Sequence, residues 1–230
     1  MIGIAVFDID GTLTDTNDVD VECYEAAVLT EIGLQIPSEW STFDDVTDAA
    51  ILAEACRRNG MTVPEEVIQE RIANRVGELL AVALSEAPSR FRPIPGAPEI
   101  FEILRQRGWG VALATGAWRP SALVKLRGAG IPHEGVPLAS ASDHWARAEI
   151  IRRAVQAASA AAAPVVYIGD GIWDGRAAKA LGYGFLGIGK GTRAADLEQI
   201  GAGAVLPDFT DAGSVLEHLS RLTDEGGDPR

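Results

Sequence analysis

The chain begins with a short apolar run that ends in two closely spaced aspartates. Residues Ile4–Phe7 are apolar, and Asp8, Asp10 and Gly11 follow them. An apolar run of this length, bounded by turn residues, predicts a buried strand. The aspartates would then lie beyond its carboxyl end, where ligands bind in open α/β sheets. The pair indicates either a cation or an acid/base site, or simply an Asp N-cap and an Asp-Gly turn.

From residue 16 to residue 92 the pattern is helical. Apolar residues recur at helical spacing over residues 21–34, 44–60 and 64–84. The proline-rich residues 90–98 follow, and we expect a linker or turn at Pro93, Pro95 and Pro98 rather than a regular element. These features predict a helical insertion.

Helices and strands then alternate along the chain. We expect strands over residues 109–115, 136–140, 164–170, 183–189 and 204–207, and helices over residues 99–108, 120–130, 143–163, 174–182, 192–201 and 211–222. This alternation predicts βα units, a parallel sheet and helices on both of its faces. The expected architecture is an α/β protein with a doubly wound, Rossmann-like core formed by residues 1–15 and 93–230. An α-helical cap domain, residues 16–92, is inserted into it.

Composition and charge exclude several classes of protein. With 47% hydrophobic and 23% charged residues, the 230-residue chain is expected to fold around a proper core. A net charge of −13 disfavours nucleic acid and anionic membranes as partners, because both are negatively charged. The two cysteines lack metal-type spacing, and the chain shows neither a signal peptide nor a membrane span. We therefore expect a soluble cytoplasmic protein, whose oligomeric state the sequence does not indicate.

Two later strand ends also carry chemistry. Thr115 and Gly116 follow the second long strand, where a hydroxyl and a glycine beside a helix N-terminus can hold an anion. An ordinary turn is the alternative. Asp170 and Asp174 follow a third strand, and carboxylate oxygens are ligands that Mg²⁺ prefers. An Asx turn with an N-cap aspartate is the alternative there.

These motifs form an ordered set. The segments VFDIDGTLTD, LATG and YIGDGIWD, with a helical insertion after the first, span almost the whole chain. In this order they resemble the haloacid dehalogenase superfamily of aspartyl-nucleophile phosphotransferases. The resemblance implies that Asp8 is the nucleophile and that Asp10 is the general acid and base. It also implies an Mg²⁺ cofactor held by the carboxylates of Asp8, Asp170 and Asp174 and by the Asp10 backbone carbonyl.

The resemblance further implies a phosphate-binding site. Thr115 and the Gly116 amide would contact the phosphoryl oxygens, together with a basic residue that is more often lysine in this family. Of the three lysines, Lys125 lies well inside a predicted helix and Lys190 follows too late a strand. Arg147, at the start of the helix before the third motif, is the best candidate because arginine binds phosphate and carboxylate bidentately.

The expected function is an Mg²⁺-dependent phosphatase that acts on a small phosphorylated metabolite through an aspartyl-phosphate intermediate. Asp10 argues against the dehalogenase and phosphonate-cleaving branches of the family. A phosphomutase, or a relative that binds a phosphorylated ligand without turnover, are the alternatives.

Three tryptophans add a separate hypothesis. Trp118, Trp145 and Trp173 lie within three residues of Thr115, Arg147 and Asp174 respectively. They form either a wall against the leaving group, a docking surface for the cap, or ordinary packing contacts.

Overall fold

The core of the protein is a parallel sheet of six strands. The computed structural model describes residues 1–36, 43, 45–158 and 163–225. The strands follow the spatial order β5-β4-β1-β6-β7-β8 and all pair in parallel. They are β1 (Ile4–Phe7), β4 (Gly110–Ala114), β5 (Leu138–Ala139), β6 (Val165–Gly169), β7 (Gly184–Ile188) and β8 (Ala204–Leu206). Because β1 pairs with β4 and β6, its carboxyl end lies between theirs.

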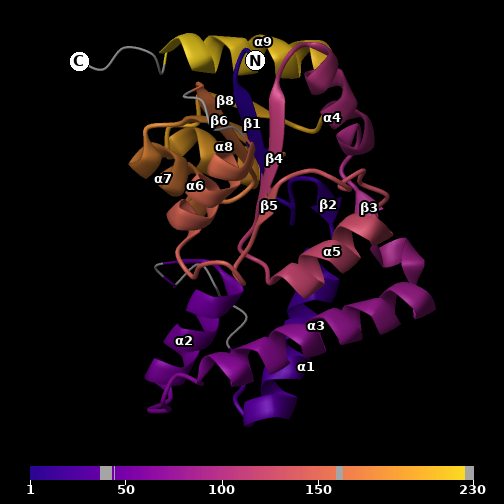
Figure 1. Ribbon diagram of the computed structural model, residues 1–230, viewed down its shortest axis with the longest axis vertical. Coiled ribbons are helices and arrows are strands. Elements are labelled where there is room, and N and C mark those ends of the chain that lie inside the picture. The colour runs from indigo at the N-terminus through magenta and orange to yellow at the C-terminus, as the bar shows by residue number, and fades with distance from the viewer. Residues whose placement is uncertain (37–42, 44, 159–162, 226–230) are drawn as a thin grey trace.

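Helices cover both faces of this sheet (Figure 1). One face packs against α6 (Arg147–Ala158), α7 (Ile172–Leu181) and α8 (Thr192–Gln199). The other packs against α4 (Ala97–Gln106), α5 (Arg119–Gly128) and α9 (Ala212–Glu225). The doubly wound α/β core predicted from the alternating pattern is therefore confirmed.

Alternation of side chains along the strands creates two hydrophobic layers. Ile4 and Val6 of β1 face α6 and α7, whereas Ala5 and Phe7 face α4 and α9. The Phe7 ring packs against Phe101, with ring centroids 5.1 Å apart. Since helices cover both faces of β1, all four of its residues are buried and apolar. This apolar run ends at Asp8.

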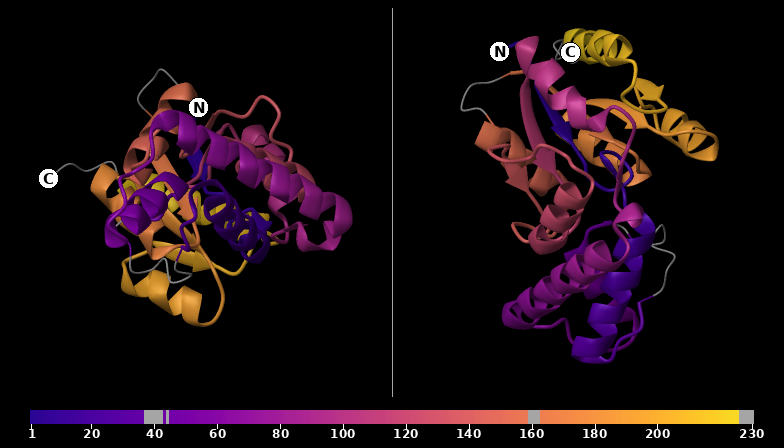
Figure 2. Two further views of the ribbon diagram at one scale, coloured as in Figure 1. Left: turned by 90° about the horizontal axis from the view of Figure 1, so that it is seen from below. Right: turned by 90° about the vertical axis from the view of Figure 1, so that its right-hand side faces the viewer.

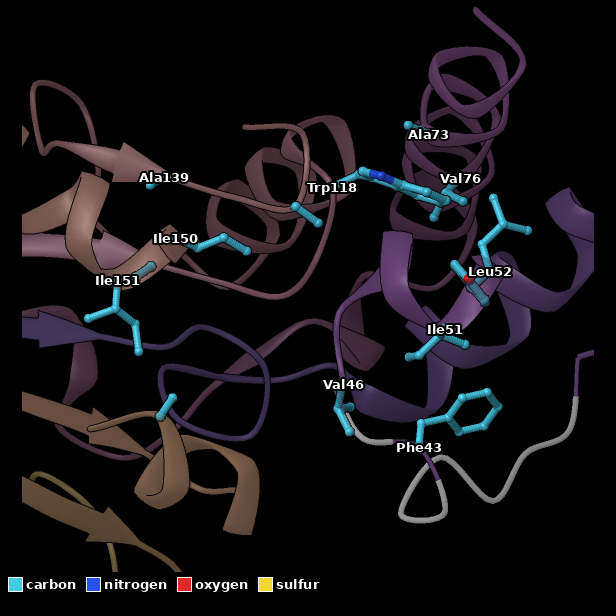
Figure 3. Packing of buried hydrophobic residues seen from close by; sticks show 14 of the residues in the cluster. Phe43, Val46, Ile51, Leu52, Ala73, Val76, Trp118, Ala139, Ile150 and Ile151 are labelled. Atoms are coloured by element: carbon cyan, nitrogen blue, oxygen red, sulfur yellow. The ribbon is translucent and has the colours of Figure 1, made fainter. Parts of the chain in front are cut away.

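A group of three helices lies beyond the carboxyl end of β1 (Figures 1 and 2). They are α1 (Asn17–Ile32), α2 (Asp48–Arg58) and α3 (Glu66–Glu86), and we call the chain segment from α1 to α3 the helical insertion. α3 packs against both α1 and α5. Figure 3 shows Trp118, just before α5, pointing between α2 and α3. The apolar cluster on the α6 side of the sheet continues into this region, so the insertion is packed onto the core.

A short antiparallel ladder joins the two chain segments that lead to the insertion. It pairs β2 (Thr14–Asp15) with β3 (Arg92–Pro93), which follows the short 3₁₀ helix η2 (Pro88–Arg90). The expectation of a linker or turn without regular structure is therefore wrong at Pro93, and it is also wrong at Pro98, which lies in the first turn of α4. Pro93 is tolerated because this ladder has only two strands, so its missing N–H faces no third strand.

Several expected helix boundaries also differ, among them the start of α2, which lies at Asp48 rather than at residue 44. The helix expected from Asp143 begins at Arg147, because Asp143 instead closes a turn by accepting hydrogen bonds from the Ser140 amide and hydroxyl. It ends at Ala158, and residues 159–162 of the expected helix lie outside the described residues. The first helix starts at Asn17, four residues before the expected start at Val21. Within the described parts of the chain, no helix has the length and apolar character needed to cross a membrane.

Candidate active site

Asp8 lies at the centre of the site because its strand does. Its backbone amide donates to the Ile168 carbonyl (2.9 Å), which continues the pairing of β1 with β6 by one residue. The ends of β4 and β6 place Thr115 and Asp170 on either side of it. The three strand ends singled out in the sequence therefore meet at one edge of the sheet.

Three buried carboxylates converge there. One oxygen from each of Asp8, Asp170 and Asp174 lies within 4.8 Å of the others. Burial, followed by repulsion from Asp174, raises the pKa of Asp8 and raises that of Asp170 to about 7. Burial also raises the pKa of Asp174. Such an all-oxygen group could hold a hard cation, because a cation offsets the repulsion between the carboxylates.

The turn after β1 brings the first motif against the third. Gly11 has a φ of +75°, a conformation that favours glycine. A Cβ atom at Gly11 would overlap the carboxylate of Asp170. The Gly11 position therefore requires both a left-handed backbone and the absence of a side chain, and the second requirement follows from the close approach to Asp170.

Arg147 connects the site to the helical insertion. Its Nη1 atom donates to Asp174 Oδ1 at 2.8 Å and Asp8 Oδ1 at 3.3 Å, and its Nη2 atom donates to the Val46 carbonyl at 2.5 Å. Burial opposes the charge on this guanidinium, but Asp174, Tyr167 and Asp8 together outweigh it, and the net effect raises the pKa of Arg147. The structure thus places the predicted basic residue beside the predicted nucleophile.

Thr115 and Gly116 form a tight turn at the end of β4. The Thr115 hydroxyl accepts a hydrogen bond from the Ala117 amide (3.1 Å). The Gly116 carbonyl accepts one from the Asp48 amide (2.8 Å), at the start of α2. A side chain at Gly116 would overlap the guanidinium of Arg147. Both residues border the same cavity as Asp8.

The Asp10 carboxylate forms hydrogen bonds to residues outside the three-carboxylate group. Its Oδ1 accepts from the Thr16 hydroxyl (3.0 Å) and its Oδ2 from Lys125 Nζ (2.7 Å). Lys125 also lies 2.8 Å from Asp20 Oδ1 of α1. Burial opposes the charge on Lys125, but Asp10 and Asp20 outweigh this effect and raise its pKa. Lys125 lies inside α5, as expected, yet its side chain reaches Asp10.

Three further charged residues beside the site were missed in the sequence. Arg193 of α8 lies 2.8 Å from Asp170 Oδ2, and Asp20 and Asp48 project from the helical insertion. A signal was present for the two aspartates and for Lys125: each occupies a position on the buried stripe of its helix. Asp48, for example, precedes Ile51, Leu52 and Ala55 at helical spacing. A charged residue at such a position indicates a partner in the interior.

The three tryptophans separate into different environments. Trp118 is buried (Figure 3). Its ring packs on that of Tyr24, with ring centroids 5.6 Å apart. Trp145 is 59% exposed, stacks on His144 and does not line the cavity that contains Asp8. Trp173 does line that cavity. Of the three, therefore, Trp173 is the one placed to contact a molecule bound in this cavity.

A cavity of about 400 Å³ encloses these groups. Its core side is bordered by Asp8, Asp10, Thr115, Gly116, Arg147 and Asp170. Its opposite side is bordered by residues of the helical insertion, including Asn17, Asp20, Thr47 and Asp48. A volume of this order accommodates a small molecule.

Comparisons with known proteins agree with this architecture. A family model for haloacid dehalogenase-like hydrolases matches residues 2–182. Similar solved structures include a hydrolase from Pseudomonas syringae, which is 22% identical with a TM-score of 0.72 and covers 94% of this chain and 99% of that chain. CbbY from Rhodobacter sphaeroides in complex with phosphate is 21% identical with a TM-score of 0.70, covering 93% and 97%.

A third similar structure is the β-phosphoglucomutase from Clostridium difficile. It is 16% identical with a TM-score of 0.70, and the match covers 96% of this chain and 98% of that chain. At these identities the structures show a shared fold. A search of the curated proteins gives no match.

Proposed function

The chain belongs to the haloacid dehalogenase-like hydrolases, and from this premise we propose that it is an Mg²⁺-dependent phosphatase of small phosphate monoesters. The observation that carries the proposal is the position of Asp8. It sits at the end of the central strand beside Arg147, in the same cavity as Thr115, Asp170 and Asp10. This arrangement supplies a nucleophile, groups to hold a phosphoryl group and a second carboxyl group for proton transfer.

In the first step, the Asp8 carboxylate attacks phosphorus and the bond to the ester oxygen breaks. Asp10 donates a proton to the departing alkoxide, so that a neutral alcohol leaves. The Thr115 hydroxyl, the Gly116 amide and the Arg147 guanidinium hold the phosphoryl oxygens. Arg147 suits this role because it is positively charged and already aimed at Asp8.

In the second step, water hydrolyses the aspartyl-phosphate. Asp10, now ionised, accepts a proton from the attacking water, and inorganic phosphate and the Asp8 carboxylate are released. The hydrogen bonds from Thr16 and Lys125 hold the Asp10 carboxylate in one orientation through both steps. Asp10 can therefore serve as acid and then as base without moving far.

An Mg²⁺ ion is part of the same proposal. The carboxylates of Asp8, Asp170 and Asp174 and the backbone carbonyl of Asp10 would hold Mg²⁺, which supplies positive charge against the phosphate and the nucleophile. The donor set fits the ion because it consists of oxygen atoms from buried carboxylates.

We further propose that the chain is divided into a catalytic core and a cap, as the sequence predicts. Residues 1–15 and 93–230 form the catalytic core, and residues 16–92 form a cap that shields the aspartyl-phosphate from bulk water. Residues of the insertion border the cavity, which supports this role. The phosphate bound to the similar CbbY structure supports a small phosphorylated ligand.

Hydrolysis of p-nitrophenyl phosphate tests the proposal. We expect turnover that requires Mg²⁺ and that is lost in Asp8→Asn, with one phosphoryl group found on Asp8 of the wild type by mass spectrometry after rapid quenching. Asp18→Asn, an exposed carboxylate of α1, is the matched control and keeps its activity. If a broad panel of phosphate monoesters is not hydrolysed with Mg²⁺ present, the phosphatase proposal fails and a binding role replaces it.

A further inference from the structure

Part of the active-site cavity is left for the alcohol portion of a bound ester. The function proposed above assigns Asp8, Thr115, Gly116 and Arg147 to the nucleophile and the phosphoryl group, and it assigns Asp170 to the metal ion. The rest of the lining comes mainly from the helical insertion and from the first turn of α7. The side chains in this second part therefore decide which alcohols the cavity accepts.

Most polar side chains of the insertion that border the cavity already have partners in the protein. Asp20 is paired with Lys125 at 2.8 Å. The Thr47 hydroxyl donates to a backbone carbonyl (2.6 Å), and Asp48 Oδ2 accepts from a backbone amide (2.8 Å). The Asn17 amide has no such partner among the described residues and can take one polar contact. A sugar or another polyol would leave several of its hydroxyl groups unpaired here, which weakens binding.

Apolar side chains supply the rest of this part of the lining. Val21, Val46 and Ile51 come from the insertion, and Trp173 comes from α7. Val21 and Trp173 are partly exposed, so a ligand in the cavity can contact them.

The Trp173 ring is also held in place from behind. It lies against the backbone of Gly171, where a Cβ atom would overlap the indole. Gly171 directly follows Asp170 at the carboxyl end of β6, so the ring is fixed beside the strand end that carries the proposed metal ligand. A supported aromatic ring that borders a cavity offers a stacking surface, and flat aromatic groups gain more from such a contact than from burial of their area alone.

We propose that Trp173 determines substrate specificity by stacking on a flat, unsaturated alcohol portion, so that the preferred substrates are phosphate esters of aromatic alcohols rather than of polyols. This inference rests on the phosphatase function proposed above and adds the class of substrate. Trp173 takes no part in the transfer of the phosphoryl group. Its role is to contact the group that leaves with the ester oxygen.

Three esters test the selection. Benzyl phosphate and cyclohexylmethyl phosphate have the same connectivity and alcohols of similar acidity, but only the first has a flat aromatic ring. Glycerol 1-phosphate represents the polyols. With Mg²⁺ present, we expect kcat/KM for benzyl phosphate to exceed that for cyclohexylmethyl phosphate by about three- to tenfold, because stacking favours the aromatic ring. It should exceed that for glycerol 1-phosphate by about tenfold or more, because hydroxyl groups remain unpaired.

Substitutions of Trp173 assign the preference to its ring. Trp173→Leu keeps an apolar side chain without a ring, so the ratio of benzyl to cyclohexylmethyl phosphate should fall to about one. Trp173→Phe keeps an aromatic ring and should retain most of the ratio. The ratio is the measured quantity because Trp173 adjoins Asp174, and a disturbed metal site would lower kcat/KM for both esters alike. Trp145→Leu is the control, since Trp145 is exposed and does not border this cavity. Its ratio should equal that of the wild type.

The outcomes separate this proposal from the one on which it rests. If p-nitrophenyl phosphate is hydrolysed but the wild type does not distinguish benzyl from cyclohexylmethyl phosphate, the specificity proposal is wrong and the phosphatase function stands. The same conclusion follows if Trp173→Leu keeps the wild-type ratio, or if glycerol 1-phosphate is as good a substrate as benzyl phosphate. If no ester is hydrolysed, both proposals are overturned.

Discussion

Lys125 Nζ lies 2.7 Å from Asp10 Oδ2, although the two residues are 115 positions apart in the chain. The lysine side chain is fully buried, and its second partner is Asp20 of the helical insertion at 2.8 Å. One buried cation thus joins the proposed acid/base residue of the core to a residue of α1. Because both carboxylates depend on it, we expect Lys125 to affect stability and turnover together.

Replacing Lys125 with methionine tests this expectation. The change leaves Asp20 buried without its counter-ion, and breaking a buried pair in this way costs about 3–5 kcal/mol of the free energy of unfolding. The value of kcat should also fall, because Asp10 loses one of the two hydrogen bonds that orient it. Urea unfolding and steady-state kinetics measure the two effects.

The control for this prediction is Lys179→Met, which removes the same charge from an exposed position on α7. It should change stability and kcat little. Equal effects of the two substitutions would contradict a special role for Lys125. The double variant Lys125→Met with Asp20→Asn should recover part of the lost stability, since the unpaired buried charge is removed.

Arg193 offers a test of the proposed metal site. Its guanidinium lies 2.8 Å from Asp170 Oδ2 and is about half exposed, so it competes with a cation for this carboxylate. We expect Arg193→Ala to lower the Mg²⁺ concentration required for half-maximal stabilisation against heat by about three- to fivefold, as a partly exposed ion pair is worth up to 1 kcal/mol. A thermal shift titration without substrate measures this.

Arg176→Ala, at an exposed position of the neighbouring helix α7, controls for the loss of positive charge near the site. It should leave the Mg²⁺ titration unchanged. A requirement for more Mg²⁺ in Arg193→Ala would show instead that Arg193 supports metal binding.

The raised pKa of Asp48 predicts that the stability of the protein depends on pH. Burial raises its pKa from 3.8 to about 8, so the folded protein holds a proton that the unfolded chain has lost at neutral pH. The stability contributed by this group is fully present below pH 3.8 and is lost as the pH rises toward 8. Asparagine has no carboxyl group to ionise, so the stability of Asp48→Asn lacks this dependence on pH. Its advantage in unfolding free energy over the wild type should therefore grow by about 2–4 kcal/mol between pH 5 and pH 8.

Urea unfolding at the two pH values measures this difference. The control Glu54→Gln should show no such growth, because hydrogen bonding to Arg58 lowers the pKa of Glu54 and keeps it ionised throughout this range. A constant difference between Asp48→Asn and the wild type would mean that Asp48 is ionised in the folded protein.

Two tryptophans should differ sharply in their contribution to stability. Trp118 is 3% exposed and packs between the core and the insertion, so Trp118→Ala should cost about 3–5 kcal/mol (Figure 3). Trp145 is largely exposed, and the hydrogen bond it accepts from the Thr47 hydroxyl uses its backbone carbonyl, which alanine keeps. Trp145→Ala should change stability by no more than about 0.5 kcal/mol. Similar losses in the two variants would contradict this assignment.

Much of the fold was predictable because the signals are local. Apolar runs of four or five residues alternating with helical patterns predicted all six strands of the main sheet and the helices around it. The β2–β3 ladder was not predictable, since two-residue strands carry no periodicity and their pairing joins residues 14–15 to residues 92–93. The start of α6 was misplaced because Asp143 resembles a helix cap, yet its carboxylate closes the preceding turn.

By itself, the sequence determined the family, the order of the elements and which aspartates meet at the sheet edge. Those features follow from short motifs at strand ends. Parallel pairing places the carboxyl ends of neighbouring strands at the same edge of the sheet, independently of how the intervening helices pack. Only the tertiary structure decided the partners of Lys125, Arg193 and Asp48. Their contacts depend on how helices from distant parts of the chain pack, and a charged residue on a buried helix face indicates that it has a partner without indicating which one.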